Sequence, residues 1–434
     1  MSYPLTVHAE TPESAKNVQR NARSQGEGGG ARRSDDRSTA GRKPPGGQVQ
    51  SRNGTRSAPP VRGSHGGQRT GRPEAGSEDK VRPGTTRMFA SVVPGMTALV
   101  TRQLDRLPGI RVTDAGFDGR SDLVLFDVDR GHRELLWSLR TIEDLFVEVG
   151  RTMRSSGDRP DWIAGRMWRP ERVEKALSVW SAEVRPLAGT MTYRVIARVL
   201  QERSFLRTEL RKAFTQAISM DKPKWRFADP AQVEVWVNEY QADRIVAGLR
   251  LSDASMRQHD GREVERSGAL RPTVAAMMVS LAGQPDGTLL DPCCGSGTIL
   301  SEAAALGWRH VQGGDIDPEA VEIARRNVPG AQVDQWDLRR LDLPDSSVGA
   351  VVANLPFGQQ FEVQGSMSTW LTDALAEMAR VTRPGGRLVL LAPNIPASAF
   401  PASVRIRGKD AIRLLGTRTV LWVFDRTADT DTDG

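Results

Sequence analysis

The chain has 434 residues, 38% of them hydrophobic, so it can bury a sizeable core and hold two or three domains. Its two cysteines, Cys293 and Cys294, are adjacent, which argues against a disulfide scaffold and a tetrahedral zinc site. This cysteine usage predicts a reduced, cytoplasmic protein without a metal. No apolar run approaches the ~18–20 residues of a membrane span. The opening MSYPLTVHAE also lacks the basic start and apolar core of a secretory signal.

The net charge of +7 resides in the N-terminal segment. Residues 1–87 hold 16 Lys and Arg against 8 Asp and Glu, which leaves −1 for the rest of the chain. The same segment contains 14 Gly, 8 Pro and one aromatic residue, Tyr3. Such a composition cannot offset the entropy of ordering, so we expect a disordered tail that is either solvated or in non-specific contact with RNA. An ordered protein that starts at Met88 would fit the same pattern.

From Met88 onward the sequence alternates between strand and helix patterns. Residues 88–151 predict a small α+β unit, and residues 152–253 predict a second one behind a connector helix. The second unit has a half-buried strand at residues 191–199, a helix that turns Leu210, Phe214 and Ile218 inward, and strands near residues 233–237 and 245–251.

Basic residues gather around the helix of the second unit, with Trp225 between them. The set is Arg203, Arg207, Arg211, Lys212, Lys222 and Lys224. Basic side chains with an interleaved aromatic residue suit contacts to RNA phosphates and bases. Charged helix faces are also commonly just solvated, so composition alone leaves both interpretations open.

Residues 254–428 alternate regularly between strands and helices, which predicts a doubly wound, mostly parallel α/β sheet of Rossmann-like type. After an apolar helix at residues 271–283, strands lead to Asp291, to GGDID at residues 313–317, to residues 331–333, to VGAVVAN and to GRLVLLAP. An antiparallel hairpin over residues 412–424 closes the sheet at one edge.

Polar residues end four of these strands, where ligands bind in open α/β sheets. Asp291 is followed by the glycine-rich turn PCCGSG, whose Gly295 and Gly297 allow close approach of the backbone to a ligand. Asp315 is placed to accept hydrogen bonds from ribose hydroxyls, and Asp337 to accept from an exocyclic amine such as that of adenine. A single acidic residue at a strand end is more often a helix cap, but four polar ends in this order favour a ligand site.

The fourth strand end, NLPFG at residues 354–358, is the most specific motif. Pro356 holds the carbonyl of Leu355 outward beside the side-chain oxygen of Asn354, and two converging acceptors can grip an amino group by both hydrogens. Phe357 offers a face on which a base can stack. The alternative is a plain turn that closes a strand.

The motifs DPCCGSGTIL, GGDIDPEAVEIARRN and NLPFG resemble those of the THUMP-domain RNA methyltransferases, in particular the tRNA guanine-N2 methyltransferases. The resemblance covers about residues 88–425. It implies a ferredoxin-like domain over 88–151, a THUMP RNA-binding domain over 152–253 and a methyltransferase domain over 254–428. It also implies S-adenosylmethionine as cofactor and RNA, with tRNA first, as partner of a monomeric enzyme.

Carried over by motif, the resemblance implies a role for each site residue. The backbone of Gly295, Ser296 and Gly297 would face the methionine moiety. The remaining cofactor residues would be Asp291 near the amino group, Thr273 near the carboxylate, Asp315 at the ribose, and Ile316, Asp337 and Leu338 at the adenine. Asn354, Leu355, Pro356 and Phe357 would hold the target guanine.

Four other functions remain open. A sister branch methylates guanine in ribosomal RNA. The Asn-x-Pro-aromatic signature also serves N6-adenine and glutamine-N5 methyltransferases, which usually have Pro and Tyr where this chain has Leu355 and Phe357. A non-catalytic RNA-binding protein would need neither the glycine loop nor NLPFG.

Overall fold

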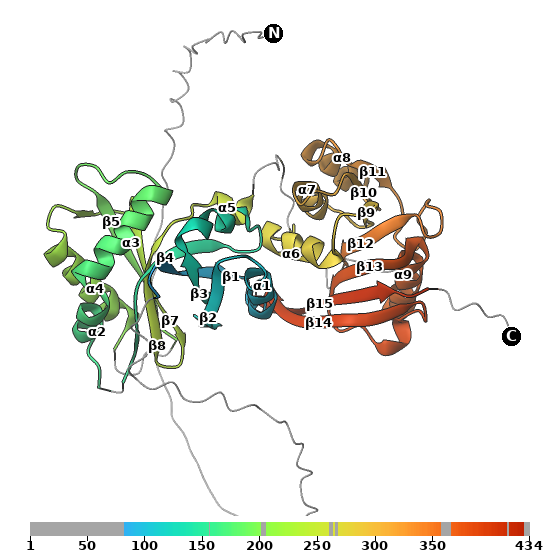
Figure 1. Cartoon of the computed structure of the whole chain (residues 1–434). Coiled ribbons are helices and arrows are strands. Elements are labelled where there is room, and N and C mark those ends of the chain that lie inside the picture. Colours follow the sequence, from blue (N-terminus) through green and yellow to red (C-terminus); the bar gives the residue numbers. More distant parts are fainter. Residues whose placement is uncertain are drawn as a thin grey trace, which may run out of the picture. The chain divides into compact units, whose positions relative to one another are not determined.

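The computed structural model describes residues 82–155, 157–200, 205–259, 264, 268–356, 366–414 and 416–428. These residues form two sheets, one of eight strands and one of seven, with helices packed on them (Figure 1). Within this part of the chain, no helix is both long and apolar enough to cross a membrane. Of the predicted tail, residues 1–87, the first 81 lie outside the described residues.

The first sheet runs in the order β2-β3-β1-β4-β8-β7-β5-β6. Its strands are β1 (Thr85–Val92), β2 (Ile110–Phe117), β3 (Asp122–Asp129), β4 (Asp144–Met153), β5 (Thr192–Arg198), β6 (Arg226–Phe227), β7 (Val233–Gln241) and β8 (Arg244–Arg250). Its helices are α1 (Thr97–Leu104), η1 (Arg130–Ser138), α2 (Pro160–Met167), α3 (Pro170–Glu183), α4 (Arg207–Asp221) and α5 (Ser255–Gln258).

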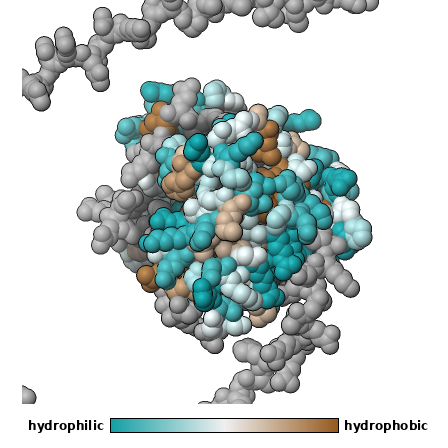
Figure 2. Space-filling view, turned by 90° about the vertical axis from the view of Figure 1, so that its left-hand side faces the viewer, coloured by the Kyte–Doolittle hydropathy of each residue, from teal (hydrophilic) through white to brown (hydrophobic). Residues whose placement is uncertain are grey.

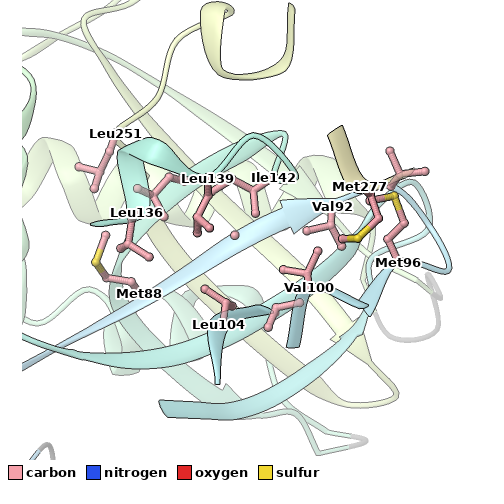
Figure 3. Close-up of a cluster of buried hydrophobic side chains, with 14 of the residues drawn as sticks. Met88, Val92, Met96, Val100, Leu104, Leu136, Leu139, Ile142, Leu251 and Met277 are labelled. Atoms are coloured by element: carbon pink, nitrogen blue, oxygen red, sulfur yellow. The ribbon is translucent and has the colours of Figure 1, made fainter. Parts of the chain in front are cut away.

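The segments predicted as two domains, 88–151 and 152–253, contribute strands to one continuous sheet. β4 joins them, because it pairs with β1 on one side and with β8 on the other. The expected boundary at residue 151 therefore falls inside a strand. Side chains of β1, α1 and η1 fill a shared interior; Figure 3 shows Met88, Val100, Leu104 and Leu136 directed into it.

The second sheet has the order β11-β10-β9-β12-β13-β15-β14, with parallel pairing except around β15. Its strands are β9 (Thr288–Asp291), β10 (His310–Asp315), β11 (Gln332–Gln335), β12 (Val348–Asn354), β13 (Thr382–Ala392), β14 (Val404–Leu414) and β15 (Thr417–Arg426). Its helices are α6 (Pro272–Ala282), α7 (Thr298–Ala305), α8 (Pro318–Asn327), α9 (Met367–Val381) and η2 (Ala397–Ala399).

Alternate residues of these strands are buried on opposite faces, which makes a three-layer α/β unit. Leu289 and Val352 pack with α6 and α7 on one face, whereas Leu290 and Val351 pack with α9 on the other. This confirms the predicted doubly wound sheet and its antiparallel closing hairpin. The strand order reverses between β9 and β12, and such a switch point is where ligands bind in open α/β sheets.

Candidate active site

The turn after β9 is a tight loop held by backbone hydrogen bonds to β10 and within the loop itself. The amide of Cys294 donates to the carbonyl of Gly314 at 2.8 Å, and the amide of Gly297 donates to the carbonyl of Cys294 at 2.8 Å. Gly295 has φ +54° and Gly297 has φ +83°, in the left-handed region that favours glycine. A Cβ added to Gly295 would meet no described atom within 4 Å, so this backbone faces open space.

Asp291 and Asp315 lie on either side of this loop. Asp291 is 1% exposed and accepts from the amide of Cys293 at 3.3 Å. Burial raises the pKa of the Asp291 carboxyl well above its usual range, and the charge of Asp315 adds to the effect. Asp315 accepts from the amides of Gly295 at 2.8 Å and Asp317 at 3.0 Å, which fixes its carboxylate between the loop and the start of α8.

The strand register brings Asp291, Asp315 and Asn354 to one edge of the sheet. Asp291 pairs with Gly313 of β10, and Leu290 pairs with Val351 of β12. Asp315 and Asn354 thus stand two residues beyond the level of Asp291, on the strands that flank β9. Three polar groups therefore surround the carboxyl end of one central strand, as the sequence predicts.

Asn354 ends β12 with its backbone held on both sides. The amide of the next residue, Leu355, donates to the carbonyl of Leu391 at 3.1 Å, and Leu355 is 2% exposed. No other described residue is bonded to the half-buried side-chain amide of Asn354, so its oxygen is available to a ligand. Pro356 is half-buried. Phe357 lies outside the described residues, and its expected stacking role stays a prediction.

Cys293 connects the glycine loop to this strand end and was missed at the level of sequence. Its thiol donates to the backbone carbonyl of Asn354 at 3.4 Å. Burial raises the pKa of the Cys293 thiol well above its usual range, and the charges of Asp291 and Asp315 act in the same direction. The protonated thiol can thus donate. The only sequence signal for this contact was the choice of Cys at a position next to the loop.

Thr273 is the second residue of α6 and is fully buried, at 0% exposure. Its hydroxyl is one of the buried polar groups without a hydrogen-bond partner among the described residues. An unsatisfied buried hydroxyl at a helix N-terminus suits an anionic ligand. The preceding Arg271 is bound to Glu143 at 2.6 Å, so it is not aimed at such a ligand.

The adenine-side residues are arranged differently from one another. Ile316 is 60% exposed and offers an apolar surface, whereas Leu338 is 6% exposed. Ser296, on the methionine side, is 5% exposed. The carboxylate of Asp337 is held by Arg339, with Nη2 to Oδ2 at 2.6 Å and Nε to Oδ1 at 3.1 Å. The hydrogen bonds from Arg339 lower the pKa of Asp337. An incoming amine would have to share this carboxylate with Arg339.

The predicted RNA-contact residues separate into two groups. Arg207, Arg211 and Lys212 are exposed on α4, and Lys224 is exposed in the following turn. Lys222 is instead bound to Glu174 and, at 3.4 Å, to Asp221, with 16% of its side chain exposed. Arg203 lies outside the described residues.

The aromatic residue that is open to solvent here is Phe227 rather than Trp225. Phe227 on β6 is 60% exposed. Trp225 is half-buried with its ring 6.2 Å from that of Tyr193. Figure 2 shows the end of the first sheet as mainly hydrophilic with scattered hydrophobic residues, so no large apolar patch competes with a polar partner.

Comparison with known proteins agrees with this fold. Residues 259–399 match the UPF0020 family, described as RMKL-like, methyltransferase domain. The chain is similar to TrmN from Thermus thermophilus, with a TM-score of 0.63 and 25% identity, covering 79% of this chain and 99% of that one. The fold and site therefore define a Rossmann-like methyltransferase domain.

Two curated relatives are similar to part of this chain. The chain is 32% identical over 219 residues to the tRNA (guanine(6)-N(2))-methyltransferase THUMP3 of Bos taurus, covering 45% of this chain and 42% of the relative. It is 37% identical over 135 residues to the U6 snRNA (guanine-N(2))-methyltransferase THUMPD2 of the same organism, covering 29% and 26%. The chain thus spans less than half the length of these relatives. Over the matched segments the chain is thus similar to RNA guanine-N2 methyltransferases of the THUMP type.

Proposed function

We propose that the chain transfers a methyl group from S-adenosylmethionine to the N2 amine of a guanosine in RNA, with tRNA as the first substrate to test. The observation that carries this proposal is the register of the second sheet. It puts two acids suited to the donor and the free amide of Asn354 on adjacent strands at a single edge.

The residues present fit S-adenosylmethionine at that edge. The buried hydroxyl of Thr273 would donate a hydrogen bond to the methionine carboxylate, and Asp291 would accept one from the amino group. The amides around Gly295, Ser296 and Gly297 would line the methionine chain. Asp315 would bind the ribose, with Ile316, Asp337 and Leu338 around the adenine. When bound, the donor supplies an electrophilic methyl group whose leaving group is a neutral thioether.

Asn354 and the carbonyl of Leu355 would accept the two hydrogens of the target amine. The N2 lone pair of guanine is delocalised into the ring, so two acceptors would shift electron density toward nitrogen and fix its line of approach. Positioning of this kind supplies much of the rate enhancement of two-reactant enzymes. Asn354 and the Leu355 carbonyl would thus hold the nitrogen in line with the methyl group that the donor would supply, and the displaced proton of the amine would pass to water.

RNA would be bound in part by the first sheet. Arg207, Arg211, Lys212 and Lys224 would contact phosphates, while Phe227 would accept a base by stacking. Residues 152–253 would thus act as the THUMP domain. The target base must leave its helix to reach Asn354. The cytoplasmic location, the monomeric state and the lack of a metal stay predictions.

Nucleoside mass spectrometry tests the proposal. Purified protein incubated with S-adenosylmethionine and unmodified tRNA should produce N2-methylguanosine. Asn354→Ala should lower kcat by about 10²–10³-fold, the usual cost of losing one preorganised polar contact to the reacting group. It should leave donor affinity and melting temperature nearly unchanged.

Asn394→Ala is the matched control, because Asn394 follows the neighbouring strand β13 and binds Lys409 at 3.1 Å rather than facing the site. Its turnover should equal that of the unaltered protein. Methylation of adenine rather than guanine, or full turnover by Asn354→Ala, would overturn the assignment. Methylation of ribosomal RNA in place of tRNA would keep the chemistry and change the substrate.

A further inference from the structure

The closing hairpin of the second sheet carries two arginines directly opposite each other. In the antiparallel register of β14 and β15, Arg413 pairs with Arg418. Both residues are exposed, and neither has an ion pair or a side-chain hydrogen bond to another described residue. Like charges at directly opposite positions destabilise a strand pair. The pair therefore costs stability with nothing in the described structure to offset it.

The other basic side chains of the same strand have partners. Arg407 contacts Asp425 at 3.1 Å, and Arg405 lies 4.0 Å from the same carboxylate. Lys409 binds Asn394 and lies 4.3 Å over the ring of Trp422. Only the opposed pair lacks such compensation among the described residues of β14 and β15.

The opposed arginines lie at the edge of the sheet that holds the candidate active site. Asn354 pairs with Leu391 of β13, and Leu391 pairs with Leu421 of β15. Arg418 is three residues beyond Leu421 in the direction of the carboxyl edge. With strands about 4.8 Å apart and residues about 3.4 Å apart, the Cα atoms of Arg418 and Asn354 are separated by roughly 14 Å.

We propose that Arg413 and Arg418 clamp a backbone phosphate of the RNA strand next to the nucleotide held by Asn354. This inference rests on the proposed function. A guanidinium binds phosphate through two parallel hydrogen bonds, and a phosphate between two arginines replaces their repulsion with attraction. The clamp extends RNA recognition from the first sheet to the methyltransferase domain itself. A competing use of such charges is protection of the edge strand β14 against pairing with another chain, at a position where the amide of Arg413 donates to the carbonyl of Pro94 at 2.8 Å.

The test compares two double variants of the full chain. Arg413→Ala with Arg418→Ala removes the clamp, whereas Arg405→Ala with Arg407→Ala removes the same charge from the other end of β14. RNA affinity is measured by fluorescence anisotropy between 50 and 200 mM salt. The clamp variant should bind RNA roughly tenfold more weakly at low salt, and the slope of log K against log salt should become less steep by about 0.7, the value for one neutralised phosphate on a single strand.

The clamp variant should melt no lower than the unaltered protein, because it loses a repulsion. The KM for RNA should rise because a phosphate contact is lost. The affinity for S-adenosylmethionine should be unchanged. The control variant should keep the affinity and the salt slope of the unaltered chain.

Three results would overturn the clamp: equal RNA affinity and slope in the clamp variant, equal losses in both variants, or no RNA binding by the unaltered chain. An increase only in aggregation of the clamp variant would support edge protection instead. Failure of the proposed function looks different, because the unaltered chain would then bind RNA with the predicted slope and methylate none of it.

Discussion

Asp291→Asn tests whether the buried carboxyl at the end of β9 serves a ligand rather than the fold. Within the described residues, its side chain is 1% exposed and receives one hydrogen bond, from the amide of Cys293 at 3.3 Å. Burial is the main reason that the pKa of Asp291 is raised well above its usual range. The hydrogen bond from the Cys293 amide lowers this pKa, whereas the charge of Asp315 raises it further. An ionised carboxylate is therefore costly here without a positive partner.

The raised pKa fixes the sign of the pH dependence. Below the unfolded pKa of about 4, both states are protonated and Asp291 carries no penalty. As the pH rises above that value, the unfolded chain ionises first. Each unit up to the folded pKa then lowers the free energy of unfolding by as much as ~1.4 kcal/mol. Asn keeps the acceptor for the Cys293 amide without the charge. At pH 7.5 the free energy of unfolding of Asp291→Asn should therefore exceed that of the unaltered protein by ~1–3 kcal/mol. Each kcal/mol corresponds to a rise of about 2–4 °C in melting temperature.

Donor affinity should change in the opposite direction. A hydrogen bond between charged groups contributes ~1.5–3 kcal/mol, so the Kd for S-adenosylmethionine should rise about 10- to 150-fold in Asp291→Asn. Scanning calorimetry from pH 3.5 to 8 gives the stability, and isothermal titration gives the affinity. The melting curves of the two proteins should converge at the acid end. A variant that is less stable at pH 7.5, or that binds the donor as tightly as before, would refute the reasoning.

Two further substitutions probe the packing around the loop. Cys293→Ala should lower kcat about 2- to 12-fold through loss of a hydrogen bond to the carbonyl that ends β12. Cys293→Ser should restore most of it, and Cys294→Ala should not change it, as single-turnover assays at saturating donor would show. Gly314→Ala should destabilise the protein by ~1–3 kcal/mol, because its Cβ would lie 1.8 Å from Nε1 of Trp336. Gly330→Ala, with no described atom within 4 Å of its Cβ, is the control; equal melting temperatures would contradict this packing.

The parallel sheet could be predicted because each of its central strands is an apolar run that ends in a polar residue. VGAVVAN is buried along its length and stops at Asn354, and the run before Asp291 behaves in the same way. A continuous apolar run of this kind indicates a strand that is buried on both faces of the sheet. The carboxyl ends of parallel strands meet at one edge whatever the strand order, so the meeting of these strand ends was also predictable.

Contacts that depend on long-range pairing were not predictable. The bond from Cys293 to the carbonyl of Asn354 joins residues 61 positions apart and exists only because β9 and β12 are neighbours. The continuous first sheet depends in the same way on the pairing of β4 with β8. The hydrogen bonds from Arg339 to Asp337 join residues close in sequence. They nevertheless depend on side-chain rotamers, which the periodicity of hydrophobic residues does not predict.

Direct titration of S-adenosylmethionine into the full chain tests the central claim most directly. We expect saturable binding to one site per chain. The melting temperature should also rise by an amount that corresponds to ~2.7 kcal/mol when the free donor is 100 times its Kd. Absence of both the binding heat and the thermal shift would contradict the assignment of the carboxyl edge as a donor site.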